Sequence, residues 1–133
     1  MADEMERELE RTTAIRGFRY GLHDFLAQLH GVEVLKKHND EMEANYLKKG
    51  LIDRKTREML ITVACICQRD SISHMRLHMH AANKAGASPE EILEMIEVLG
   101  LWIGGISRAF AWEAWRAQFR PDIPPIDRIV ELR

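Results

Sequence analysis

The apolar positions of this chain recur every three to four residues over most of its length, which is the period of an α-helix. Residues 18–30 and residues 33–48 each place their large apolar side chains on one helical face. We find no alternating pattern that would predict a β-hairpin. Residues 4–16 are rich in charge, so we expect them to form either a first helix or a frayed arm. The pattern therefore predicts an all-α fold.

The most apolar stretch covers residues 59–67, and Asp53 is a suitable N-cap for the helix that contains it. A helix that is apolar all round is usually buried, so we expect this one to be the central helix. After a short polar break, Ser71 or Ser73 can cap a further helix, which ends at Gly86.

The sequence Ser88-Pro89-Glu90-Glu91 is a capping box with proline at the first helical position, which indicates the start of another helix. A last helix is expected over residues 106–119. Three prolines then favour an extended tail over residues 120–133. We therefore predict one domain over residues 1–133, an all-α bundle of about six helices in which residues 1–17 form an arm or a helix.

Composition narrows the class of protein. The chain has 133 residues, of which 46% are hydrophobic and 30% are charged, as in a globular domain. The net charge is −2 and no basic block is present, so we expect neither a nucleic-acid partner nor a membrane partner. The charged N-terminus lacks the apolar core of a signal peptide, and we expect a cytoplasmic protein.

Candidate chemistry is concentrated in one segment, in which His74, His78 and His80 lie within seven residues. The unperturbed pKa of histidine is about 6.5, so such a cluster suits proton transfer or metal binding. His74 and His78 are four residues apart and share a helix face. His80 is turned by about 200° from His78, and we expect it to face solvent or a partner chain.

Metal binding is the first alternative for this segment. His74 and His78 could form half of a zinc site, but the glutamate of an H-E-x-x-H motif is missing. A catalytic zinc needs three protein ligands, so His38 or a distant carboxylate would have to complete the site. Cys65 and Cys67 point about 200° apart on a helix and cannot grip one metal together. We therefore expect no metal, and we expect the cysteines to be free thiols.

A longer arrangement spans residues 51–112. Its elements are Leu51-x-Asp53-x-Lys55-x-Arg57-Glu58, a helix with His78, Ala81, Ala82 and Gly86, the capping box at Ser88, and Gly104. In these elements the chain resembles the carboxymuconolactone decarboxylase family, which includes the alkylhydroperoxidase D-like proteins. The resemblance implies an all-α bundle that assembles as a homotrimer or homohexamer, with pockets at or near subunit contacts.

The resemblance also separates two branches of the family. In the thiol-active branch, a glutamate precedes a C-x-x-C pair, and a histidine follows four residues after the second cysteine. Counting back from His78 places Ser71 and His74 at the cysteine positions. Disulfide chemistry needs two thiolates that can reach each other, so we expect no reductase activity.

The decarboxylase branch is more similar, since it lacks the cysteine pair and has an R-L-H run like the one that ends at His78. This resemblance implies a cofactor-independent lyase or isomerase that acts on a small carboxylated lactone or unsaturated acid. We assign three catalytic candidates: His78 as general acid/base, Glu58 as the residue that orients His78 or acts as its proton partner, and His74 as the second candidate on the same face. The candidates for binding substrate carboxylates are Arg57, Arg76 and Arg108.

Two other functions stay open at this point. One is a metal-dependent hydrolase or metal-binding protein that uses His74 and His78. The other is a non-catalytic oligomeric member of the same family.

Overall fold

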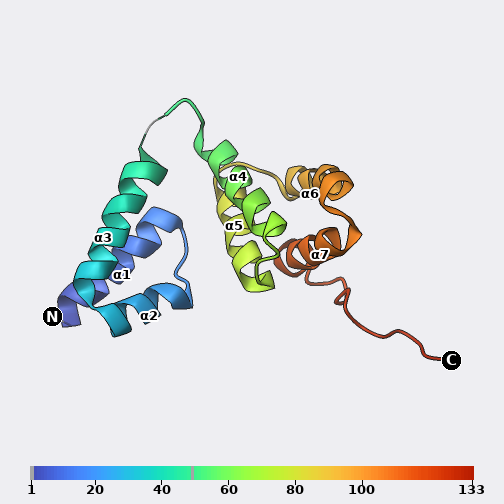
Figure 1. Cartoon of the computed structure of the whole chain (residues 1–133), viewed down its shortest axis with the longest axis horizontal. Coiled ribbons are helices and arrows are strands. Elements are labelled where there is room, and N and C mark those ends of the chain that lie inside the picture. The colour runs from blue at the N-terminus through green and yellow to red at the C-terminus, as the bar shows by residue number, and fades with distance from the viewer. Residues whose placement is uncertain (1, 49) are drawn as a thin grey trace. The chain divides into compact units, whose positions relative to one another are not determined.

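The computed structural model describes residues 2–48 and 50–133, and all the regular structure in them is helical. Seven α-helices and one short π-helix follow one another (Figure 1): α1 (Ala2–Arg16), α2 (Gly21–His30), α3 (Val32–Met42), η1 (Glu43–Leu47), α4 (Arg54–Cys67), α5 (Ile72–Lys84), α6 (Pro89–Ile103) and α7 (Gly105–Phe119). The predicted all-α fold is confirmed. The seventh helix is α1, the segment for which the sequence left helix or arm open.

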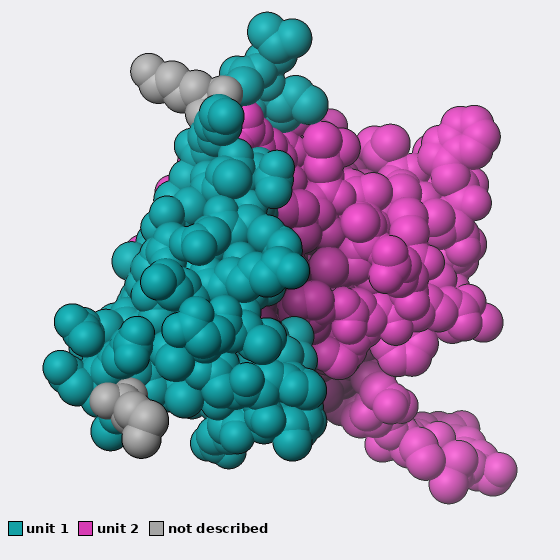
Figure 2. Space-filling model, turned by 60° about the vertical axis from the view of Figure 1, so that its left-hand side comes forward, with its two compact units in different colours: residues 1–53 teal, residues 54–133 magenta. Residues whose placement is uncertain are grey.

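The chain divides into two compact units, residues 1–53 and residues 54–133 (Figure 2). In the first unit, α1, α2 and α3 pack against one another around Leu9, Ala27 and Leu35. The organisation as one domain stays a prediction, because the structure does not determine how the two units are placed relative to each other.

A buried polar contact ties α1 to α3. The Thr12 hydroxyl lies 2.8 Å from Asn39 Oδ1, and the Asn39 amide donates to the Glu8 carbonyl oxygen at 2.9 Å. Both Thr12 and Asn39 are almost fully buried. Since a buried polar group is costly when it has no partner, these hydrogen bonds hold the two helices in one register.

In the second unit, α5 packs between α4 and α7, and α6 packs mainly on α7. Their shared core is apolar and well buried, and it includes Ile66, Met75, Met79, Ile92, Ile96, Ala111 and Ala114. The two helices that carry the candidate site, α4 and α5, lie side by side (Figure 1). They are joined by a turn that contains Asp70.

The predicted helix starts of this unit are confirmed. The Ser71 hydroxyl accepts from the His74 N–H at 3.1 Å, so Ser71 is the cap of α5. The Ser88 hydroxyl accepts from the Glu91 N–H at 3.0 Å, and the Glu91 carboxylate accepts from the Ser88 N–H at 3.3 Å. Between α6 and α7, Gly104 has a φ of 90°, which favours glycine.

The expectation that α4 is buried on all sides is wrong. Its buried residues Glu58, Thr62, Cys65 and Ile66 lie on one face, at helical spacing. On another side of the helix, Leu60 is 53% exposed. The helices that pack against α4 therefore cover only part of the apolar surface formed by residues 59–67.

After Phe119 the chain forms no further helix or strand in residues 120–133, all of which the structure describes. Arg116 Nη1 donates to the Ile123 carbonyl oxygen at 2.6 Å, and Glu113 Oε2 accepts from the Ile126 N–H at 2.9 Å. The first part of the tail is thus tied to α7. None of the described helices is long and apolar enough to cross a membrane.

Candidate functional site

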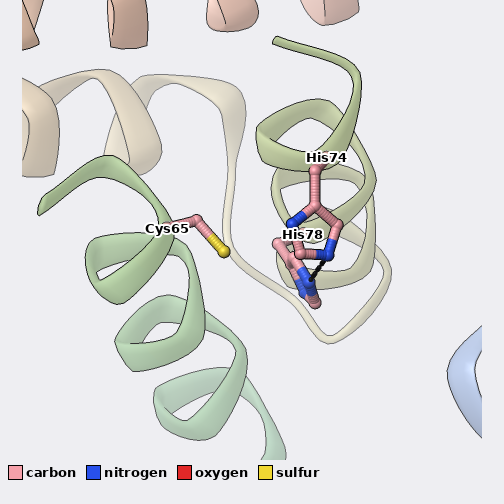
Figure 3. A group of neighbouring side chains, drawn as sticks. All are labelled: Cys65, His74 and His78. Atoms are coloured by element: carbon pink, nitrogen blue, oxygen red, sulfur yellow. Dashed lines mark hydrogen bonds between the residues drawn. The ribbon is translucent and has the colours of Figure 1, made fainter. Parts of the chain in front are cut away.

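The site begins with two histidines on one face of α5. His74 Nε2 and His78 Nε2 are 3.1 Å apart, a hydrogen-bonding distance, and the rings meet edge to face (Figure 3). His78 is only 2% exposed, whereas the His74 side chain is 29% exposed. The spacing of four residues brings the rings together, as the sequence predicted. His80 belongs to the same helix and is half-buried.

A carboxylate supports the first of these histidines. Asp70 Oδ2 pairs with His74 Nδ1, and Asp70 Oδ1 accepts from the Ser71 N–H at 2.7 Å. Partial burial raises the pKa of Asp70, but the hydrogen bonds from His74 and Ser71 outweigh it and hold the pKa below its usual value. Asp70 is therefore ionised near neutral pH.

The protonation of the three residues follows from this arrangement. An ionised carboxylate can only accept a hydrogen bond, so His74 carries a proton at Nδ1. A single proton can then lie between the two Nε2 atoms, either on His78 or on a His74 imidazolium whose charge Asp70 balances. Asp70, His74 and His78 thus form a hydrogen-bonded series, which we call the relay. Asp70 was not among the predicted site residues, although its spacing of four residues from His74 was a usable signal.

Cys65 of α4 lies beside the two rings, and its sulfur points towards them (Figure 3). Its Sγ and one ring nitrogen from each of His74 and His78 all lie within 4.8 Å of one another. Cys65 is buried, while Cys67 is exposed. Neither cysteine takes part in a disulfide, as expected. However, the third side chain beside the histidines is Cys65, which was not among the predicted site residues.

Glu58 is fully buried on the same face of α4, seven residues before Cys65. Its Oε1 accepts from Arg54 Nε at 2.7 Å, one helical turn away. Its Oε2 is buried and has no hydrogen-bond partner among the described residues. Glu58 is not part of the group formed by Cys65 and the histidines. Arg54 was not predicted as its partner, although the spacing of four residues allows the pair.

The three candidate arginines lie on three different helices. Arg57 is half-buried on α4. Arg76 is exposed on α5, and its Nε donates to Gln118 Oε1 of α7 at 3.3 Å. The Arg108 guanidinium lies 4.6 Å from the centre of the Trp112 ring, which indicates a cation–π contact. These contacts place Arg76 and Arg108 against α7 residues and leave their predicted role in substrate binding untested.

Three hollows among the described residues are lined by side chains other than those of the candidate site. One, of about 440 Å³, is lined by α4 and α6, with Val63, Met95 and Trp102 among its residues. Another, of about 540 Å³, lies between α7 and the tail. The third lies along the end of α3 and η1. None of the three includes Glu58, His74 or His78 among its lining residues.

The model of the carboxymuconolactone decarboxylase family matches residues 33–117 of the chain. The chain belongs to this family. The predicted family is therefore confirmed, and the relay, Cys65 and Glu58 all lie within the matched region. No curated protein and no solved structure matches the chain. The family covers decarboxylase-like and alkylhydroperoxidase D-like members, so membership alone leaves the reaction and the substrate open.

Proposed function

We propose that this carboxymuconolactone decarboxylase family protein is a cofactor-independent lyase or isomerase that uses histidine acid/base chemistry. The observation that carries the proposal is the series of hydrogen bonds from Asp70 through His74 to His78. Such a series holds one mobile proton in a largely buried position. The substrate class, a small carboxylated lactone or unsaturated acid, is the one that the family suggests.

The chemistry needs few groups. Loss of carbon dioxide leaves an electron pair that the unsaturated substrate delocalises, and a proton must then reach the carbon that lost the carboxylate. The proton held between the two Nε2 atoms supplies it, with His78 as the donor. His74 passes the next proton inward, since it is the more exposed of the two histidines. Asp70 stabilises the imidazolium that forms.

The substrate carboxylate needs a cation, and the candidates remain Arg57, Arg76 and Arg108. We assign Glu58 a positioning role. Its carboxylate, paired with Arg54, fixes the buried face of α4 that lies against the histidine helix.

We further propose that the protein is a homo-oligomer, a trimer or a hexamer. Large apolar side chains are exposed on α6 and α7 in the single chain, and we call this set the α6–α7 apolar surface: Val98, Leu101, Trp102, Ile106 and Phe110. Trp102 is 86% exposed. Apolar surface of this kind usually marks a protein contact. A second copy could also complete a pocket next to the histidines. A cytoplasmic location stays a prediction.

The test is a decarboxylation assay on carboxylated muconolactones and related unsaturated acids, followed by ultraviolet absorbance. His78→Gln is expected to lower kcat by about 10²–10⁴-fold, the usual contribution of general acid/base catalysis. His80→Gln is the matched control, because it removes a histidine of the same helix outside the relay. Asp70→Asn should lower kcat/KM and also shift its pH profile.

Full activity in His78→Gln would overturn the assigned role. If the wild-type protein converts none of these substrates, the alternative of a non-catalytic oligomeric family member gains support.

A further inference from the structure

Three side chains of types that bind transition metals converge between α4 and α5. They are the thiol of Cys65 and the imidazoles of His74 and His78 (Figure 3). We propose that these residues bind a zinc ion, although the sequence alone led us to expect no metal. One thiolate and two imidazoles are ligands that zinc favours, and three protein ligands leave a fourth position open for water or a small ligand.

The distances suit this ion. In a tetrahedral zinc site with Zn–N distances of about 2.0–2.1 Å, two ligating nitrogens are about 3.3 Å apart. The two Nε2 atoms are already 3.1 Å apart, close to this spacing. Because they now face each other in a hydrogen bond, the rings must turn so that both lone pairs meet at one ion. The sulfur lies within 4.8 Å of one ring nitrogen from each histidine. A Zn–S bond of about 2.3 Å requires it to approach by roughly 1 Å. A rotation of the Cys65 side chain can supply that shift.

The surroundings of the ligands support the same assignment. Asp70 accepts from His74 Nδ1, so His74 keeps its lone pair at Nε2, the nitrogen that faces His78. A carboxylate behind a ligating histidine is the usual way in which proteins orient that ligand and raise its basicity. Cys65 and His78 are buried, which keeps bulk water away from two of the three ligands.

The proton balance of binding is simple. The Cys65 thiol loses its proton to solvent when zinc binds, because the thiolate is the ligand. His78 gives up the proton at Nε2 and carries one at Nδ1 instead. The ion then occupies both Nε2 lone pairs and interrupts the relay. Metal binding requires only this geometry, whereas the inhibition that follows from it rests on the proposed function.

The experiment is a titration of the purified full-length protein, reduced and freed of metal by a chelator, with Co²⁺ as the spectroscopic probe. We expect saturation at one Co²⁺ per chain, the intense visible bands of a tetrahedral complex, and a near-ultraviolet thiolate-to-cobalt band. Zn²⁺ should remove all of these bands by displacing Co²⁺.

The two cysteines provide a matched pair of variants. Cys65→Ser should abolish the thiolate band, whereas Cys67→Ser should keep it, because Cys67 is exposed on another side of α4. Cys65→Ala is the second variant at this position, and far-ultraviolet circular dichroism checks that each variant is folded. Asp70→Asn should weaken binding about 10–100-fold while leaving the spectrum unchanged.

The absence of saturable binding at millimolar Co²⁺ would overturn the proposal. The same holds if the thiolate band persists in a folded Cys65→Ser protein. The result separates cleanly from the test of the proposed function, because the spectrum is read without any substrate. A cobalt spectrum without decarboxylase activity would refute the function and leave the metal site standing. If the protein is active, Zn²⁺ does not inhibit it and no cobalt spectrum appears, the metal site is refuted and the proposed function stands.

Discussion

Two neighbouring cations in the first turn of α4 provide a test of what burial contributes to an ion pair. Arg54 contacts Glu58 and Lys55 contacts Glu91, and both N–O distances are 2.7 Å. The Glu58 side chain is fully buried, whereas the Glu91 side chain is 47% exposed. Arg54→Met and Lys55→Met each remove the charge and keep an apolar stem of similar length. The two variants therefore differ mainly in the environment of the carboxylate that loses its partner.

The expected effects differ in size. Leaving a buried charge without its partner costs about 3–5 kcal/mol in typical proteins. The Arg54 side chain is 35% exposed, so water can compensate part of this loss. We expect Arg54→Met to lower the free energy of unfolding by about 2–3 kcal/mol. An exposed pair contributes about 0–1 kcal/mol, and Lys55→Met should cost no more than that.

The assay is urea unfolding followed by tryptophan fluorescence, which reports on residues 54–133 because all three tryptophans lie there. Adding Glu58→Gln to Arg54→Met removes the unpaired charge and should recover at least about 1 kcal/mol. Equal losses for Arg54→Met and Lys55→Met would refute the argument from burial. So would a double variant that is no more stable than Arg54→Met alone.

Three further predictions concern other parts of the chain. Burial, followed by the charges of His38 and Arg16, lowers the pKa of His23 to about 4, and its Nδ1 accepts from the Tyr20 N–H at 3.2 Å. The pKa of His23 in the folded state lies below its unfolded value of about 6.5. The contribution of His23 to the free energy of unfolding is therefore complete above about pH 6.5 and is lost as the pH falls towards 4. The urea midpoint of the full-length protein, followed by circular dichroism, should fall over this range, and a His23→Gln protein whose midpoint falls equally steeply with pH would contradict the assignment. Ser88→Ala removes the α6 cap and should lower the free energy of unfolding by about 1 kcal/mol, again by urea unfolding; no measurable loss would mean that the capping box is not stabilising. Trp102→Glu should reduce the oligomer mass measured by light scattering without changing helix content, and an unchanged mass would exclude the α6–α7 apolar surface as the subunit contact.

Much of the fold follows from local sequence signals. The starts of α4, α5 and α6 lie where Asp53, Ser71 and Ser88 predicted them, since an N-cap acts on the first turn that follows it. The exposure of α4 could not be predicted in the same way. An apolar run predicts that some partner covers it, but only the packed structure shows which side its neighbours leave exposed.

The candidate site likewise combines features that follow from local sequence with features that depend on tertiary packing. The sequence by itself determined the family, the helix, and the pairing of His74 with His78, because residues four apart on a helix face the same way whatever surrounds them. The contact of Asp70 with His74 could also have been predicted from a spacing of four residues, although it was overlooked. Only the tertiary structure decided that Cys65 lies beside the two rings and that Glu58 is buried. The physical reason is that the rotation of α4 against α5 depends on the shared core, and the spacing along either helix does not determine it.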